Sequence, residues 1–136
     1  MKLRLLATLT LAAVAAVSWS APAWADTPAD ILAAYAAKSN ASPQPERGQK
    51  MFTTNFGREM GLSCSSCHGA VPVRTGRDVV TEKPIAPMAP AANSRRFTDR
   101  SKVEFWFGQN CKDVIGRECT AGEKADLISW LMTLKP

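Results

Sequence analysis

Cys64-Ser65-Ser66-Cys67-His68 is the stretch of this 136-residue sequence with the most specific chemistry. Two cysteines three positions apart, with a histidine directly behind them, are typical of covalent haem attachment. Both thiols can form thioethers with one edge of the porphyrin, and the histidine can ligate the iron. The pattern predicts one haem c, attached through Cys64 and Cys67 and ligated on its proximal side by His68.

Three other interpretations of this stretch are open at the level of sequence. A zinc site would use Cys64, Cys67, His68 and a further cysteine, although structural zinc sites more often pair two Cys-x-x-Cys clusters. A thioredoxin-like redox pair would need a strand leading into the first cysteine, and no strand pattern precedes it. The string can also occur by chance. Haem attachment is favoured because an export signal and helical patterns accompany the motif.

The sixth coordination position decides what such a haem does. His68 is the only histidine in the sequence, so a second imidazole would have to come from another molecule. Met88 lies in a proline-rich stretch and is the first candidate, because a thioether makes an ordinary electron carrier of raised potential. Met88 can equally pack against the ring as an adaptable filler. A lysine, an asparagine oxygen or no ligand are the other options.

The first 25 residues have the three regions of a secretory signal peptide. Lys2 and Arg4 precede an apolar run from Leu5 to Val17, and Ala23-Trp24-Ala25 is a small-x-small cleavage site. The apolar run is shorter than the ~20 residues that span a bilayer, although a retained membrane anchor is the alternative. We expect cleavage after Ala25, a periplasmic location, and one domain over residues 26–136 without stable membrane insertion.

The charge of the chain argues against one class of partner. Loss of Lys2 and Arg4 with the leader lowers the net charge from +5 to +3, and the basic residues are scattered, so no nucleic-acid partner is expected. A redox partner protein with an acidic surface is expected, and the chain is expected to be a monomer. The cations in or beside the loop after the haem motif can pair with haem propionates or steer that partner: Arg74, Arg77, Arg95, Arg96, Arg100 and Lys102.

Helical patterns predict an all-α fold. Residues 26–39 and 45–55 are expected to form two helices, with a break between them at residues 42–45. Capping boxes at residues 101–104 and 120–123 predict a short helix through Phe107 and a longer one that ends near Pro136. Residues 70–100 lack periodicity and predict a long functional loop. The residues expected to face the core are Ile31, Leu32, Tyr35, Met51, Phe52, Phe56, Leu127, Ile128, Leu131 and Leu134.

Several segments resemble known haem proteins. Residues 45–52 and 125–131 resemble the two helices of class I cytochromes c that cross beside the haem. Residues 105–120 closely resemble the sphaeroides haem proteins, a family of oxygen-binding monohaem cytochromes c, and residues 83–90 and 96–99 are also similar. The resemblance implies a class I cytochrome c-like fold, with helices packed around one covalent haem.

In that family an asparagine directly before a disulfide cysteine is the distal ligand, and it leaves the iron on reduction. Asn110 has that position here. The chemistry agrees, because an amide oxygen is a hard, weak ligand that suits ferric iron better than ferrous iron. The alternative is that Asn110 caps the C-terminus of a helix.

Cys111 and Cys119 remain once the haem takes two thiols, and export favours a disulfide between them. Closing so short a loop stabilises the folded state by about 2.5 kcal/mol on chain-entropy grounds. A structural disulfide would hold Asn110 over the iron. The functional alternative is a redox-active disulfide that exchanges electrons with the haem.

The resemblance implies a periplasmic protein that accepts an electron and binds O2 or NO at the site that Asn110 leaves. A multihaem or dihaem cytochrome is one candidate for its redox partner. The main alternative is an ordinary electron-transfer cytochrome c with Met88 bound in both redox states. A dedicated haem reductase or oxidase is not favoured, because the sequence offers no distal acid or base beyond Asn110.

Overall fold

Five helices and one two-stranded hairpin make up the part of the chain that the structure, a computed structural model, describes: residues 25–58 and 61–136. The helices are α1 (Pro28–Ser39), α2 (Pro45–Thr53), α3 (Cys64–His68), α4 (Arg100–Val114) and α5 (Ala121–Thr133). Strands β1 (Gly76–Arg77) and β2 (Pro84–Ile85) pair antiparallel within the long loop. The all-α prediction is confirmed. The expected signal peptide lies, apart from Ala25, outside the described residues. Within them, no helix is long and apolar enough to cross a membrane.

The N-terminus of α1 is fixed by local hydrogen bonds. The Thr27 hydroxyl accepts from the Asp30 backbone N–H at 3.2 Å, and the Asp30 carboxylate accepts from the Thr27 backbone N–H at 2.9 Å. These bonds satisfy donors that the first turn of a helix leaves free, and hydrogen bonds from Thr27 lower the pKa of Asp30. The helix starts at Pro28 and not at residue 26, because Thr27 has extended backbone geometry.

Helix α4 differs from its prediction at both ends. Its N-cap is Asp99 and not Ser101: the Asp99 carboxylate accepts from the Ser101 hydroxyl at 2.6 Å and from the Lys102 backbone N–H at 3.1 Å. The Ser101 bond first, and the Lys102 bond next, lower the pKa of Asp99 to about 2. The helix continues well past Phe107 to Val114. Val103, Phe107 and Cys111 recur at helical spacing and are buried, so tertiary packing extends the helix.

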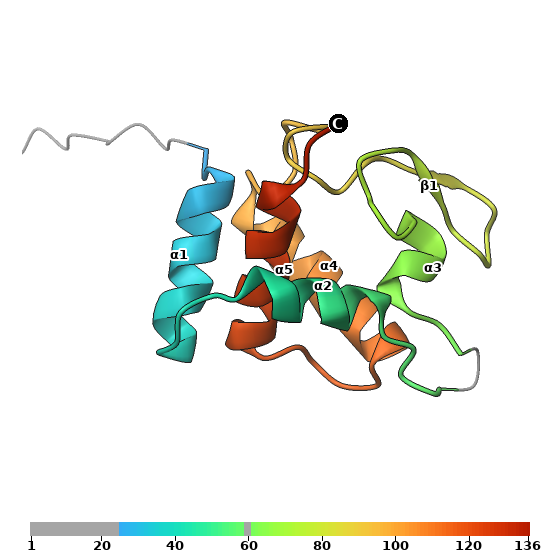
Figure 1. The fold of residues 1–136 in the computed structure, drawn as a ribbon, viewed down its shortest axis with the longest axis horizontal. Helices are drawn as coiled ribbons and strands as arrows, with labels where there is room; N and C mark the ends of the chain where they lie inside the picture. Colours follow the sequence, from blue (N-terminus) through green and yellow to red (C-terminus); the bar gives the residue numbers. More distant parts are fainter. Residues whose placement is uncertain (1–24, 59–60) are drawn as a thin grey trace, which may run out of the picture.

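Helix α5 is the centre of the molecule and follows its prediction closely. The Thr120 hydroxyl accepts from the Glu123 backbone N–H at 3.2 Å, and the Glu123 carboxylate accepts from the Thr120 backbone N–H at 2.8 Å. In Figure 1 α2 crosses α5, α1 lies beside α5, and α3 with the hairpin lies at the far end of α2 from α1. The side chains that α5 buries are Ala125, Asp126, Leu127, Ile128, Trp130 and Leu131.

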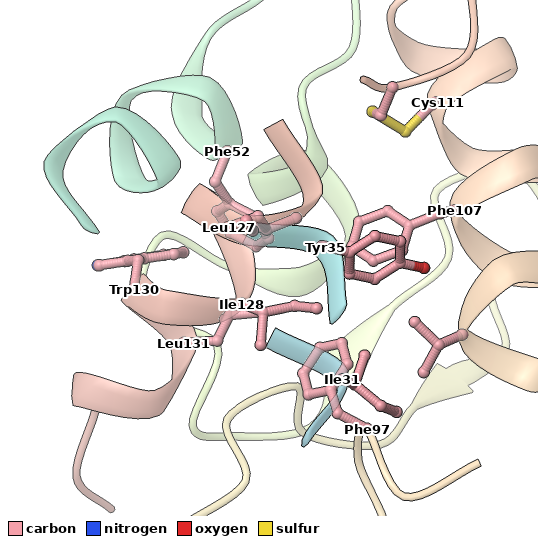
Figure 2. Close-up of a cluster of buried hydrophobic side chains, with 13 residues drawn as sticks. Ile31, Tyr35, Phe52, Phe97, Phe107, Cys111, Leu127, Ile128, Trp130 and Leu131 are labelled. Carbon is pink, nitrogen blue, oxygen red and sulfur yellow. A yellow bond between two sulfur atoms is a disulfide. The ribbon is translucent and has the colours of Figure 1, made fainter. Parts of the chain in front are cut away.

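The core joins α5 to each of the long helices around it (Figure 2). Phe52 of α2 is fully buried, and its ring centroid lies 4.9 Å from that of Trp130. Ile31 and Tyr35 of α1 belong to the same cluster, and the Tyr35 ring meets Phe107 of α4 edge-on at 6.0 Å. Six of the ten expected core residues are buried, whereas Leu32, Met51 and Leu134 are only partly buried and pack against this cluster. Phe56 is also only partly buried and lies outside the cluster, so its prediction as a core residue is wrong.

The crossing of α2 and α5 depends on a glycine. A Cβ atom on Gly48 would overlap the backbone carbonyl of Asp126, so the two helix backbones touch at this point. The Asp126 carboxylate, almost fully buried, accepts from the Gln44 backbone N–H at 2.7 Å and from Arg47 Nε at 2.7 Å and Nη2 at 3.1 Å. Close backbone approach and these three bonds hold the start of α2 on α5.

Gly48→Ala is therefore expected to lower the free energy of unfolding by about 1–3 kcal/mol, the usual cost of forcing an extra methyl group into a packed contact. Gly122→Ala is the matched control, because its Cβ would lie 3.6 Å from Ser39 Cβ, an ordinary contact. Alanine also favours a helix over glycine by up to about 1 kcal/mol, so the control should be neutral or stabilising. Thermal and denaturant unfolding measure both. Equal stability of the two variants would contradict the backbone contact at Gly48.

Candidate functional site

Helix α3 presents the haem-attachment motif as a single helical turn. The Ser66 hydroxyl accepts from the Ser63 backbone N–H at 3.1 Å, and Ser63 has the extended geometry of an N-cap. At the other end Gly69 has φ 75°, a conformation that favours glycine, and it stops the helix directly after His68. Cys64 and Cys67, three positions apart in this turn, therefore lie on neighbouring parts of one helix face.

Neither motif cysteine takes part in a disulfide, and both are partly buried. Burial first, and the nearby Cys67 next, raise the pKa of the Cys64 thiol to about 11. A reactive Cys-x-x-Cys redox pair requires the opposite, a lowered thiol pKa. No strand leads into the motif within the described residues, since β1 and β2 follow it. The thioredoxin-like interpretation therefore loses its support.

His68 is prepared to act as a neutral ligand. Burial first, and the positive charge of Arg96 next, lower the pKa of the imidazole to about 4. The ring is consequently unprotonated at neutral pH, which is the form that binds a metal ion. The Phe52 ring lies 6.1 Å from the imidazole, centroid to centroid, and thus connects His68 to the α2–α5 crossing.

The hairpin packs directly against α3. A Cβ atom on Gly76 would overlap the carbonyl of Cys67, and it would lie 3.0 Å from His68 Cα. A cavity of about 520 Å³ lies between α3 and the hairpin, lined by Ser66 and Cys67 on one side and by residues such as Arg77 and Val79 on the other. Neither His68 nor Asn110 lines it, so it flanks the attachment turn and does not enclose the expected iron ligands.

The donor set fits haem and not zinc. In residues 25–58 and 61–136 no group of three or more His, Cys, Asp or Glu side chains is arranged to hold a metal ion, and a structural zinc site needs four such ligands. Two unpaired thiols on one helical turn, with a neutral imidazole directly behind them, match thioether attachment and proximal ligation. These three residues would hold the haem.

Met88 lies in a loop that hydrogen bonds fix through the backbone. The backbone N–H groups of Met88 and Ala89 both donate to the Pro72 carbonyl, at 3.0 and 3.1 Å. Arg96 donates to the carbonyls of Ala86 and Pro87, at 2.5 and 2.7 Å. The Met88 side chain is partly buried and packs against the core cluster. This is the placement of a packing residue, consistent with the second of the two roles that the sequence left open.

Asn110 lies inside α4 and its side chain is exposed. The C-cap of α4 is Ile115, so the interpretation of Asn110 as a helix cap is wrong. Cys111, the next residue, is buried in the core, which fixes the rotation of this part of the helix. Trp106, one turn earlier, is also exposed and lies on the same side of α4 as Asn110.

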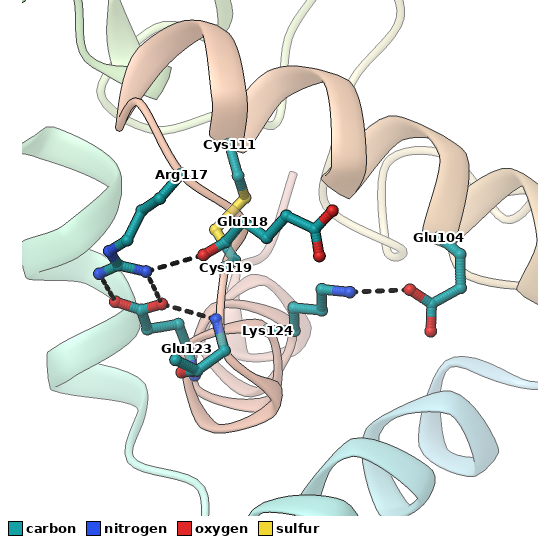
Figure 3. Close-up of a disulfide and its surroundings, with 8 residues drawn as sticks. Glu104, Cys111, Arg117, Glu118, Cys119, Glu123 and Lys124 are labelled. Carbon is teal, nitrogen blue, oxygen red and sulfur yellow. Dashed lines mark hydrogen bonds and ion pairs between the residues drawn. A yellow bond between two sulfur atoms is a disulfide. The ribbon is translucent and has the colours of Figure 1, made fainter.

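A disulfide joins the last turns of α4 to the start of α5 (Figure 3). Cys111 and Cys119 form it with a Cα–Cα distance of 5.7 Å, and both are buried. Around it Arg117 donates to both oxygens of the Glu123 carboxylate, at 2.6 and 2.8 Å. The structure thus contains the disulfide that the sequence predicted, and connects the segment behind Asn110 to the central helix.

Of the six cations considered from the sequence, three have carboxylate partners: Arg77 with Glu82, Arg100 with Asp26, and Lys102 with Asp99. Sequence reasoning missed that Arg96 differs from the other five cations, because its carbonyl partners, Pro87 and Ala86, lie nine and ten positions earlier in the chain. It also missed Gly76, whose only sequence signal is that it is a glycine near the motif.

Comparisons with known proteins match most of the chain. A family model described as a domain of unknown function, DUF1924, matches residues 38–131. The cytochrome c-type protein SHP of Cereibacter sphaeroides is 49% identical over 107 residues, which are 77% of this chain and 82% of that protein.

Two solved structures are similar along most of their length. Oxidised SHP, described as an oxygen-binding cytochrome c, aligns with a TM-score of 0.75 and 46% identity, covering 79% of this chain and 97% of that one. Cytochrome c'' of Methylophilus methylotrophus, whose solution structure concerns haem-ligand detachment, aligns with a TM-score of 0.70 and 34% identity, covering 80% of this chain and 94% of that one.

The attachment residues can be tested by intact mass after denaturation. Cys64→Ala/Cys67→Ala should give bare polypeptide from a haem-competent host, because no thioether can form. Cys111→Ala/Cys119→Ala is the control: it also removes two cysteines, but those of the disulfide, and it should retain one haem per chain. Retention of covalent haem by the first variant, or its loss from the second, would contradict the assignment.

The disulfide is expected to act as a structural link. Cys111→Ala/Cys119→Ala should lower the free energy of unfolding by about 2.5 kcal/mol, because the unfolded chain regains loop entropy. At low temperature the ferric absorption spectrum should match that of the wild type. A haem potential that follows the thiol state of the wild-type protein would instead establish the redox-active alternative.

Proposed function

The chain belongs to the SHP family of c-type cytochromes and has one covalent haem, and on that premise we propose that it is a periplasmic protein that accepts an electron and then binds O2 or NO. Its fold is the class I cytochrome c-like, all-α arrangement that the sequence predicted. When bound, the haem supplies a one-electron redox centre and a sixth coordination position at its iron.

The distal ligand in this proposal is Asn110. The observation that carries it is the placement of Asn110: an exposed amide in the interior of a helix, directly before a buried disulfide cysteine. An exposed asparagine contributes little to helix stability and makes no cap here, so helix stability gives no reason for an amide at this position. The buried Cys111 holds the helix so that this face of α4 is reproducibly oriented.

The amide of Asn110 acts as a redox-dependent ligand. Its oxygen is a dipole without net charge, and its attraction to the iron falls when the iron loses positive charge on reduction. Asn110 would then leave the iron, and the sixth position would be open to O2 or NO. The freed side chain also has an NH2 group, which can donate a hydrogen bond to the incoming ligand.

The relatives support this proposal. SHP is described as an oxygen-binding cytochrome c, and the description of cytochrome c'' refers to detachment of a haem ligand. The partial burial of Met88 against the core and the absence of a second histidine from the sequence are compatible with Asn110 as the distal residue. Reversible electron transfer with a partner, such as a multihaem or dihaem cytochrome, would reset the ferric state. The alternative is a Met88-ligated electron carrier.

Carbon monoxide binding to the reduced protein separates the two candidates. The reduced wild type should bind carbon monoxide rapidly and completely, because Asn110 has left the iron. Asn110→His should give a low-spin ferric spectrum and carbon monoxide binding slowed by roughly tenfold or more, since 1.4 kcal/mol of retained imidazole ligation suffices for that factor. Met88→Ala should leave the ferric spectrum and the binding rate close to those of the wild type. Rapid mixing and absorption spectroscopy measure all three.

The alternative, a Met88-ligated electron carrier, predicts the opposite result for the wild type and for Met88→Ala. A six-coordinate ferrous haem that does not react with carbon monoxide would refute the Asn110 switch. Loss of a sulfur-to-iron charge-transfer band in Met88→Ala would identify Met88 as the ligand. Asn110→Ala provides a further control, because it should retain ferrous ligand binding while its ferric spectrum changes.

A further inference from the structure

Arg96 is unusual among the cations of the described residues. Seven lysine or arginine side chains there pair with a carboxylate, and Arg96 is not one of them. Arg74 and Arg95 also lack such a pair, but both are exposed and water can solvate them. Arg96 is only partly exposed, and burial lowers its pKa. A positive charge withdrawn from water without a counter-charge costs free energy.

The contacts of Arg96 leave that cost uncompensated. Its Nε donates to the Pro87 carbonyl at 2.7 Å, and its Nη2 donates to the Ala86 carbonyl at 2.5 Å. Both acceptors are neutral, so they orient the guanidinium without balancing its charge. Arginine has five N–H donors, and these two bonds leave the Nη1 group and the second hydrogen of Nη2. One N–H of Nη1 and the free N–H of Nη2 together match the two oxygens of a carboxylate.

The orientation of Arg96 is imposed by its neighbour. Phe97 is buried against the core, near Ile31 in Figure 2, and it adopts φ 57°, a left-handed conformation that a bulky residue rarely takes. This turn places the Phe97 ring in the core while Arg96 reaches back across the loop to the carbonyls beside Met88.

We propose that Arg96 binds a propionate carboxylate of the covalently attached haem. The unpaired guanidinium and its free donor edge fit an anion beside the loop of Ala86 and Pro87. A haem attached at Cys64 and Cys67 brings two carboxylates. This inference rests on the covalent haem of the proposed function and is independent of the Asn110 switch.

Arg96 would then be a positioning residue with two consequences. It joins the haem to the loop of Ala86 and Pro87, so that the loop and the porphyrin have one fixed relative orientation. Its charge also lies near the iron, where a positive charge favours the ferrous over the ferric state. Removing it should lower the reduction potential of the haem.

The test compares two variants of the haem-loaded protein that lose the same charge. Arg96→Gln should shift the propionate bending modes in the resonance Raman spectrum and lower the reduction potential. Arg95→Gln removes a charge from the exposed neighbouring residue and should leave the Raman modes unchanged, with a smaller change in potential. Intact mass of the same samples shows that haem is attached, so a failure of attachment is distinguished from a failure of this inference.

Unchanged propionate modes in Arg96→Gln would overturn the inference and leave Arg96 as a link within the loop alone. If Arg96→Gln does not accumulate with haem, Arg96→Lys decides the question. Lysine keeps the charge but replaces the two-pronged donor by a single ammonium group. The propionate modes should shift in that variant while the potential stays near the wild-type value; modes identical to those of the wild type would contradict the assignment.

Discussion

The contact between the backbones of α2 and α5 at Gly48 is the constraint on which the rest of the structure depends. Because no side chain separates the helices there, Phe52 is brought fully into the core, 4.9 Å from the Trp130 ring. The same Phe52 ring meets the His68 imidazole at 6.1 Å. Two aromatic contacts, through Phe52, therefore connect the expected proximal ligand to the central helix α5. The buried Asp126 carboxylate, which binds Gln44 and Arg47, keeps α2 in that position.

The attachment turn α3 and helix α4, which carry the residues expected on the two sides of the haem, are both connected to α5. On one side, the attachment turn reaches α5 through Phe52 and Trp130. On the other, α4 reaches the start of α5 through the disulfide between Cys111 and Cys119. A change in the position of α5 would consequently move both sides together. Such an arrangement would keep the proximal imidazole and the proposed distal side chain in register, although they come from helices far apart in the sequence.

Burial determines which groups of the site carry charge. The imidazole of His68 is kept neutral by loss of water and by the charge of Arg96, while burial keeps the Cys64 thiol protonated before attachment. The guanidinium of Arg96 remains charged and is held by neutral carbonyls. A haem carries carboxylates at one edge, so the proposed Arg96 contact would make the protein and the cofactor complementary in charge at this loop.

Much of this protein is determined by local sequence alone. Cys64, Cys67 and His68 predict the cofactor because thioether attachment and ligation need only one helical turn, and the capping residues Thr27 and Thr120 predict two helix starts because their bonds span three residues. The predicted start of α4 was wrong, since Asp99 and Ser101 are both competent caps and it is the Asp99 carboxylate that accepts from the Lys102 backbone N–H. Only the tertiary structure shows that Asn110 lies inside a helix, that Gly48 is a helix contact and that Arg96 lacks a carboxylate within the described residues. Each of these depends on which distant segments share one core, and a pattern read along the chain does not contain that information.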